Sequence, residues 1–228
     1  MQHNRLTTTL GLVTTAVIAT LVVPVQARAS NLQVNSGVTS VFLDEPLLES
    51  VGLDLTGASN TVSPSSDFLV GFNIAPNTNF TFNNNNGFSL IGGSIEHSGS
   101  VTFNDALTVG NFSIGFDQSR ASGSASGFFV KDTITTNAVL FDIANIAPAV
   151  NGNNLQINGD LLVSQELAGV LNNQTLRGAA VGRAQTNATT ITTTTVPTSS
   201  NQSTRVPEPT SALGFLAVGV GMITLRKG

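Results

Sequence analysis

His97, in the tripeptide Glu96-His97-Ser98, is the residue in the middle of the chain whose type best suits acid–base chemistry. A serine-type hydrolase needs a histidine base that a carboxylate orients and that lies within about 3 Å of a nucleophilic hydroxyl. Adjacent residues of a strand point to opposite faces, so Glu96 and His97 cannot serve one site. We therefore expect no catalytic residues here, and we expect the change His97→Gln to leave stability and function unaffected.

Other nucleophiles and metal ligands are also isolated. The loop Gly123-Ser124-Ala125-Ser126-Gly127 differs from the Gly-x-Ser-x-Gly elbow of serine hydrolases, and no helix follows it, so it is interpreted as a turn. The chain has no cysteine, which excludes disulfide scaffolds and thiolate metal sites. A zinc site with His97 as the single histidine would depend on carboxylates. We expect neither a metal nor a cofactor.

Single carboxylates are the next candidates. Six aspartates are spaced along the middle of the chain, mostly where strands are expected to end: Asp67, Asp105, Asp117, Asp132, Asp142 and Asp160. Aspartate favours turns at such positions, and no Asp-x-Asp-x-Asp-Gly calcium loop occurs. A calcium ion at a loop end remains an alternative. A glycoside hydrolase would need two of these groups about 5 to 9 Å apart.

Charge and aromatic content exclude nucleic acid as a partner. Residues 30–205 carry twelve acidic and five basic side chains, a net charge of −7, which repels phosphate backbones. The chain has 13 Phe and neither Tyr nor Trp, so the aromatic platforms on which bases stack are scarce.

The first 29 residues have the pattern of a secretory signal peptide. Arg5 precedes an apolar run from Leu10 to Val23, and Ala27-Arg28-Ala29 offers the small-x-small pattern that signal peptidase accepts. We predict cleavage after Ala29 and export of the rest. An uncleaved anchor helix, short for a bilayer, is the alternative.

The end of the chain contains two further segments. Residues 186–205 are rich in Thr and Ser and poor in apolar residues, which predicts an extended, solvated stalk. Residues 206–228 contain Pro207-Glu208-Pro209, the apolar run Thr210–Leu225, and the basic pair Arg226 and Lys227. A helix over the apolar run would span about 24 Å, slightly less than the hydrocarbon core of a bilayer.

This tripartite tail resembles the PEP-CTERM sorting signal of exported bacterial proteins. The resemblance covers about 23 residues, with Pro207, Glu208 and Pro209 as its defining motif and Arg226 and Lys227 as its basic end. It implies transient membrane insertion and processing by a membrane-embedded exosortase. The alternative is a plain tail anchor, in which the two prolines only end the helix.

Residues 30–185 predict one all-β domain, an antiparallel β-sandwich of jelly-roll type. Period-two alternation in short runs, separated by Gly, Asn, Asp and Pro, indicates strands. The clearest runs are Val38–Leu43, Phe68–Ile74, Asn79–Phe82, Gly99–Phe103, Asn111–Phe116, Phe128–Lys131, Val139–Ile143, Leu155–Ile157 and Leu161–Val163. The same alternation places Phe72 and Phe116 in the core.

Caps and repeats add detail to this fold. Asp44–Val51 and Ser164–Leu171 each begin with a capping residue and predict short helices. Asn83–Gly87 predicts a hairpin loop. Residues 67–73 resemble residues 111–117, and residues 31–35 resemble residues 154–158, which indicates equivalent strands or chance similarity in a biased composition.

Together these features predict a non-enzymatic protein of the bacterial cell envelope, cell surface or extracellular matrix, as in a biofilm. A β-sandwich would be displayed by a sorted C-terminal tail, with a structural or adhesive role and surface polysaccharide as a partner. Signal peptidase and exosortase would be its processing enzymes. Two alternatives remain: a secreted hydrolase of matrix polysaccharide, and a binding module with a Phe-lined cavity between its sheets.

Overall fold

The computed structural model describes residues 31–50, 52–65 and 67–193, and these residues form an antiparallel β structure. In order along the chain, its elements are β1 (Asn31–Leu43), α1 (Glu45–Ser50), β2 (Leu55–Ser59), β3 (Val70–Ile74), β4 (Thr81–Asn83), β5 (Ser89–Gly92), β6 (Ile95–Ser98), β7 (Ser100–Phe103), β8 (Leu107–Gly110), β9 (Ser113–Phe116), η1 (Gln118–Arg120), β10 (Ala125–Lys131), β11 (Val139–Asn151), β12 (Asn154–Val163), α2 (Gln165–Val170), η2 (Gln174–Leu176) and β13 (Ala180–Thr193). The predicted all-β class with short helices is confirmed.

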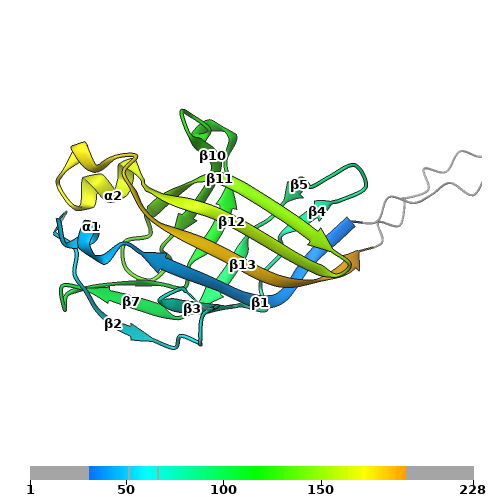
Figure 1. The fold of residues 1–228 in the computed structure, drawn as a ribbon, viewed down its shortest axis with the longest axis horizontal. Coiled ribbons are helices and arrows are strands. Elements are labelled where there is room, and N and C mark those ends of the chain that lie inside the picture. Colours follow the sequence, from blue (N-terminus) through cyan, green and yellow to red (C-terminus); the bar gives the residue numbers. More distant parts are fainter. Residues whose placement is uncertain (1–30, 51, 66, 194–228) are drawn as a thin grey trace, which may run out of the picture. The chain divides into compact units, whose positions relative to one another are not determined.

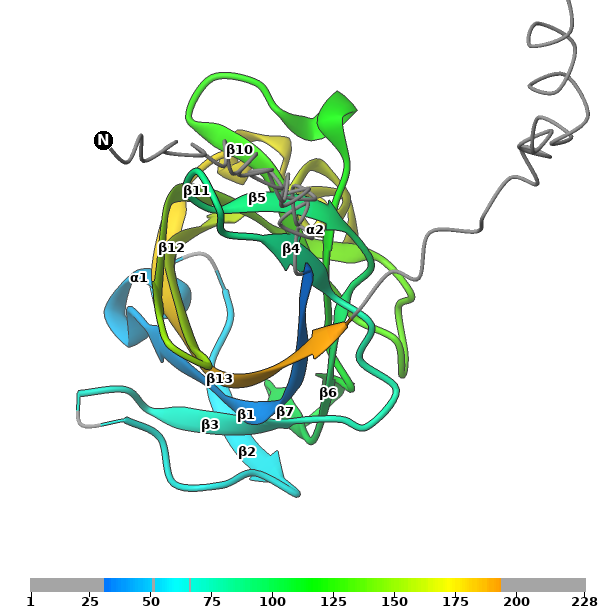
Figure 2. The same cartoon turned by 90° about the vertical axis from the view of Figure 1, so that its right-hand side faces the viewer.

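The larger of two sheets closes on itself. Its order is β13-β12-β11-β10-β9-β6-β3-β1-β4-β5, and β13 also pairs with β1. Seen end-on, the strands form a ring around the core (Figure 2). The two layers expected of a sandwich are therefore opposite walls of one closed sheet, and a second sheet, β2-β7-β8, lies beside it.

Both ends of the described part of the chain lie at one end of the closed sheet. β1 begins there and β13 finishes there, with Asn31 opposite Thr193 in the strand register. The helices α1 and α2 lie at the other end (Figure 1). A tether at either terminus would thus leave the helical end and the outer faces of the sheet free.

The predicted boundary between domain and stalk at residue 186 is wrong for residues 186–193. These residues form the second half of β13, between β1 and β12. Thr186, Ala188 and Thr190 point inward and are buried, and the residues between them point outward. Composition predicted a solvated tract, but β-branched Thr suits a strand, and alternation with Ala supplies a buried face of small side chains.

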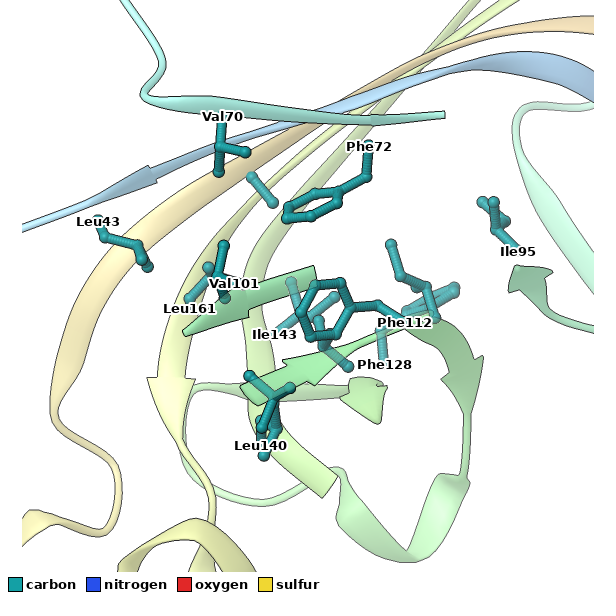
Figure 3. Packing of buried hydrophobic residues seen from close by; sticks show 14 of the residues in the cluster. Leu43, Val70, Phe72, Ile95, Val101, Phe112, Phe128, Leu140, Ile143 and Leu161 are labelled. Atoms are coloured by element: carbon teal, nitrogen blue, oxygen red, sulfur yellow. The ribbon is translucent and has the colours of Figure 1, made fainter. Parts of the chain in front are cut away.

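One hydrophobic cluster fills the closed sheet (Figure 3). Phe72 is buried there and packs edge-to-face on Phe112 with ring centroids 4.9 Å apart, as the alternation predicts. The equivalent prediction for Phe116 is wrong, because its side chain is 39% exposed at the end of β9. Val101 and Val109 of the smaller sheet belong to the same cluster, so the two sheets share one core.

Local sequence signals explain both α-helices and one loop. The Asp44 carboxylate accepts from the N–H of Leu47 at the start of α1, and the Ser164 hydroxyl accepts from the N–H of Leu167 at the start of α2. The predicted loop Asn83–Gly87 joins β4 to β5. In the part of the chain that the structure describes, no helix is both long and apolar enough to cross a membrane.

Candidate functional site

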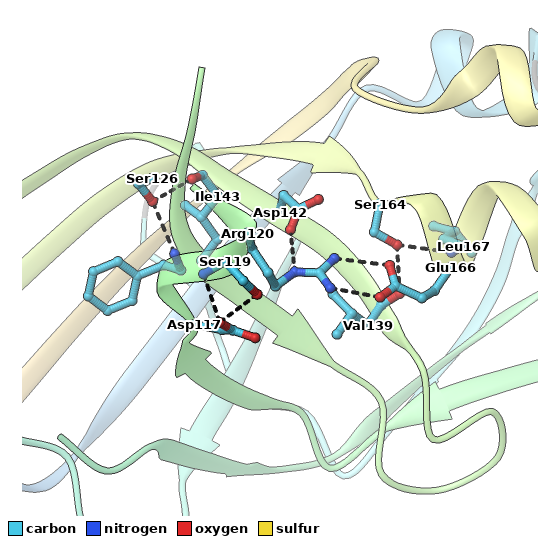
Figure 4. Close-up of polar contacts among 11 residues, drawn as sticks. Asp117, Ser119, Arg120, Ser126, Val139, Asp142, Ile143, Ser164, Glu166 and Leu167 are labelled. Carbon is cyan, nitrogen blue, oxygen red and sulfur yellow. Dashed lines mark hydrogen bonds and ion pairs between the residues drawn. The ribbon is translucent and has the colours of Figure 1, made fainter. Parts of the chain in front are cut away.

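The main cluster of charged side chains in the described residues joins three elements that are distant in sequence. Arg120 at the end of η1 contacts Asp142 of β11 and Glu166 of α2 (Figure 4). Its Nε lies 2.7 Å from Asp142 Oδ1, and its Nη1 and Nη2 lie 2.7 and 3.0 Å from the two Glu166 oxygens. We call these three residues the Arg120 cluster. Its bidentate geometry is the one in which arginine binds carboxylate most strongly.

Short capping interactions position the members of the Arg120 cluster. Asp117 caps η1, because its carboxylate accepts from both the N–H and the hydroxyl of Ser119. The hydroxyl of Ser164 both caps α2 and donates to the carbonyl of Val139 at 2.7 Å, which ties α2 to the start of β11. Arg120 and Glu166 therefore meet because two local caps fix the turns that carry them.

The electrostatics of the Arg120 cluster favour permanent charge. Hydrogen bonds from Arg120 hold the pKa of Glu166 below its ordinary value, and the same contacts raise the pKa of the guanidinium. A glycosidase acid needs a carboxyl whose pKa is raised, so that it carries a proton at neutral pH. Glu166 has the opposite shift. The arrangement suits an ionic clamp between η1, β11 and α2.

A polar hollow of about 190 Å³ adjoins the Arg120 cluster. Its other lining residues offer hydroxyl, amide and guanidinium groups: Ser119, Ser122, Gln165 and Arg177. Pockets for drug-sized ligands usually have about 300 to 1,000 Å³. This hollow can accept hydrogen-bonding groups at its mouth, but it is too small to enclose such a ligand.

His97 lies inside the closed sheet and not at a surface site. Its Nδ1–H donates to the carbonyl of Phe112 at 2.9 Å, since a carbonyl can only accept. Its Nε2 therefore accepts from the hydroxyl of Thr39 at 2.7 Å, and that hydroxyl accepts in turn from Thr186 at 2.9 Å. Glu96 points to the opposite face of β6, as predicted, where Ser94 and Ser113 donate to it.

The expectation that His97 contributes nothing to stability has to be revised. Burial lowers the pKa of His97 to about 4, outweighing the Phe112 carbonyl and the charge of Glu96, which raise it. In the unfolded chain, His97 takes up a proton near its ordinary pKa of 6.5, whereas in the folded domain it stays neutral down to about pH 4. The domain therefore keeps its full free energy of unfolding above pH 6.5 and loses part of it as the pH drops towards 4. At 1.36 kcal/mol per pKa unit, the loss amounts to about 3 kcal/mol.

We expect His97→Gln to remove this acid-sensitive phase from fragment 31–193 while lowering stability at neutral pH by about 1 to 3 kcal/mol, because a buried hydrogen bond is lost. Urea unfolding between pH 7 and pH 4 measures both effects. Parallel pH profiles for the wild type and the variant would show that His97 does not carry the transition.

An interior cavity borders this histidine. It measures about 50 Å³ and is lined by apolar side chains, including Phe72, Phe112 and Leu161, with Thr39 and His97 as its polar members. Such a volume is far below that of an ordinary ligand pocket. The cavity is a packing void of the core, and it gives the hypothesis of a Phe-lined binding module no room for a ligand.

The remaining predicted site residues are dispersed or lie outside the described part. Ser126 donates to the carbonyl of Ile143, so its hydroxyl is used within β10 and β11. Among residues 31–50, 52–65 and 67–193, no group of three or more His, Asp or Glu side chains is placed to hold a metal ion. The predicted cleavage and sorting residues lie outside the described residues: Ala27, Ala29, Pro207, Glu208, Pro209, Arg226 and Lys227.

Sequence reasoning missed the Arg120 cluster entirely. Asp142 is 22 residues and Glu166 is 46 residues from Arg120, and none of the three belongs to a motif. The one available signal was the scarcity of basic residues in the middle of the chain, which makes each arginine a candidate partner for several carboxylates.

Comparisons with known proteins reveal similarity at the level of solved structures. No family model and no curated protein matches the chain. Among solved structures, the C-terminal domain of HtaA from Corynebacterium glutamicum is similar, with 15% sequence identity, a TM-score of 0.47, and coverage of 70% of this chain and 99% of that one.

Proposed function

We propose that this chain is an exported protein of the bacterial cell envelope or extracellular matrix, with a structural or adhesive role. The β domain of residues 31–193 is its working part, and the tail sorts and anchors it. The supporting observation is the position of Asn31 beside Thr193, because it brings the predicted signal-peptide and stalk junctions to one end of the domain. A domain tethered at that end presents its other surfaces outward.

The domain's geometry favours this role over the two alternatives. The two carboxylates of the Arg120 cluster, Asp142 and Glu166, are both paired with one guanidinium, which suits a clamp better than a hydrolase. The interior void is too small for a ligand. What remains available to a partner is the outer surface of the closed sheet and the loops at its helical end.

Changes in the Pro-Glu-Pro motif test the sorting step. An exosortase must read residues 207–209, whereas a plain anchor needs only the apolar run and its flanking charge. We therefore expect Glu208→Ala, or Pro207 and Pro209 changed together to Ala, to leave a longer, membrane-retained form in the native host. Intact-mass spectrometry of the isolated protein measures both ends of the chain.

A proline outside the motif supplies the control. Pro197→Ala changes the predicted stalk and should leave processing normal. If the wild type keeps its full tail in its own host, or if the motif variants are processed like the control, the tail is only an anchor.

A further inference from the structure

The outer face of β12 and β13 carries a continuous chain of four amide side chains. Gln156 donates to Asn187 at 3.0 Å, Asn187 donates to Gln185 at 3.0 Å, and Gln185 donates to Asn158 at 2.9 Å. Asn187 also donates to the hydroxyl of Ser65 at 3.2 Å. We call Gln156, Asn187, Gln185 and Asn158 the amide chain. It lies on the wall formed by β11, β12, β13 and β1 (Figure 1).

The strand register explains why these amides stand together. Gln156 lies opposite Asn187, and Asn158 lies opposite Gln185, so two cross-strand pairs follow one another on the same face. On the β11 side the opposing residues are Ala149 and Ala147, whose side chains are too short to cover the amides. The amide side chains therefore project beyond the short alanine side chains of the neighbouring strand β11.

Two hollows open along the amide chain. One, of about 480 Å³, is lined by residues that include Asn151, Asn154 and Thr189, and it contains no charged side chain. The other, of about 310 Å³, is lined by residues that include Asp160 and Arg183, one charge of each sign. Ala188 of β13 lines the first hollow and Ala184 of β13 lines the second. These two residues are four positions apart, which at about 3.3 Å per residue separates the hollows by roughly 13 Å.

We propose that this face binds a neutral polysaccharide chain that spans both hollows. Sugar hydroxyls donate and accept, and each primary amide does both. Hydrogen bonds within the amide chain already fix the side chains, so little rotamer freedom is lost on binding. The amino group of Asn158 and the carbonyl oxygen of Gln156, at the two ends, make no hydrogen bond to another described residue.

A protein partner fits this face less well. β12 and β13 are both paired on either side, so no backbone groups are free to add a further strand. Protein interfaces depend on clustered aromatic and aliphatic anchors, whereas this face offers only two separate apolar side chains, Phe68 and Ile191, beside the amide chain. The near absence of net charge argues equally against an ionic polymer. The inference names the partner class of the proposed adhesive role and rests on that role for its setting.

Retention on insoluble polysaccharide tests the proposal. The full chain, solubilised in detergent, is incubated with cellulose, chitin and cross-linked dextran, and the bound fraction is measured. We expect retention on at least one of them, competition by its soluble oligosaccharides, and no loss when the salt concentration rises to about 0.5 M, because screening acts only on charges.

Matched variants locate the binding face. The double change Gln185→Ala and Asn187→Ala should weaken retention about tenfold or more. Ala149→Glu, which fills the first hollow but leaves all four amides, should weaken it as well. The control changes Asn84→Ala and Asn86→Ala remove two exposed amides from the β4–β5 loop and should have no effect. Unfolding midpoints verify that every variant is folded.

Several outcomes would overturn the proposal. These are no retention on any of the three polysaccharides, equal retention of the amide-chain variant and the control, or retention that salt abolishes. Self-association of the wild type that the amide-chain variant loses would identify a second copy as the partner instead. Tail processing in the native host is independent of this assay, so failure of the sorting proposal and failure of this one are distinguishable.

Discussion

A fragment of residues 31–185 should show no cooperative thermal transition, whereas a fragment of residues 31–193 should fold. The eight additional residues complete β13, which pairs along one edge with β1, from Asn31 to Thr39, and along the other with the start of β12. Without them the sheet opens over that length, and the buried side chains of Val34 and Leu155 gain access to water.

The size of the effect follows from what these residues bury and bond. Thr186, Ala188 and Thr190 are all buried, and the hydroxyl of Thr186 ends the hydrogen-bond chain that begins at His97. Small domains have a net stability of about 5 to 15 kcal/mol, so loss of two strand edges and their core contacts exceeds what the fold can tolerate.

Circular dichroism of the two fragments measures this result. A third fragment, residues 31–205, adds only predicted stalk and should melt at the same temperature as 31–193. Equal melting temperatures for 31–185 and 31–193 would mean that the second half of β13 is dispensable and that the sequence-based boundary was right.

Alternation and capping made much of this fold predictable. All nine predicted strand segments overlap observed strands, and both predicted helices are present. The segments that were missed, β2, β5, β6, β8 and β13, lack a run of large apolar residues. β13 shows why: its inward residues are Ala and Thr, so the signal was periodicity in small side chains rather than hydrophobicity.

The internal repeats indicated the right strands but the wrong burial. The repeats at residues 67–73 and 111–117 contribute β3 and β9, which flank β6 on its two sides, and those at 31–35 and 154–158 lie in β1 and β12, which flank β13. Phe72 and Phe116 nevertheless differ. Phe72 lies within β3 and is 3% exposed, whereas Phe116 is the last residue of β9 and is 39% exposed, with its ring edge-to-face on Phe128 and beside Gly127.

Candidate sites were less predictable than strands, because their members are brought together only by register. The amide chain depends on the pairing of β12 with β13, and the Arg120 cluster depends on the meeting of η1, β11 and α2. No local pattern encodes either arrangement. Asp132 lies between these two cases. Its position after a strand is predictable from the sequence, but the backbone N–H groups that its carboxylate binds there are not.

Replacing Asp132 by Asn should lower the free energy of unfolding by about 3 to 5 kcal/mol. The side chain is fully buried, and its two oxygens accept from the N–H groups of Gly110, Ile134, Thr135 and Thr136 and from the Thr136 hydroxyl. Asn has one acceptor oxygen where Asp has two, so the side-chain NH2 of the variant would face backbone N–H groups that need an acceptor. Urea unfolding of fragment 31–193 measures the loss.

Asp105→Asn is the matched control, because Asp105 is an exposed turn residue and its change should alter stability by less than about 0.5 kcal/mol. A loss for Asp132→Asn as small as that of the control would mean that water replaces the missing acceptor.

The acid unfolding of the domain should separate the roles of Asp132 and His97. Burial raises the pKa of Asp132, but its backbone and hydroxyl donors outweigh burial and hold the pKa below the ordinary 3.8. Its contribution is therefore complete above pH 3.8 and is lost only as the pH falls further, through the lower pKa of the folded state. His97 acts at higher pH, between 6.5 and about 4. The wild type should accordingly lose stability in two phases, with His97→Gln removing the upper phase and Asp132→Asn the lower. If either single substitution removed both phases, Asp132 and His97 would titrate as one unit, although they lie in different parts of the closed sheet.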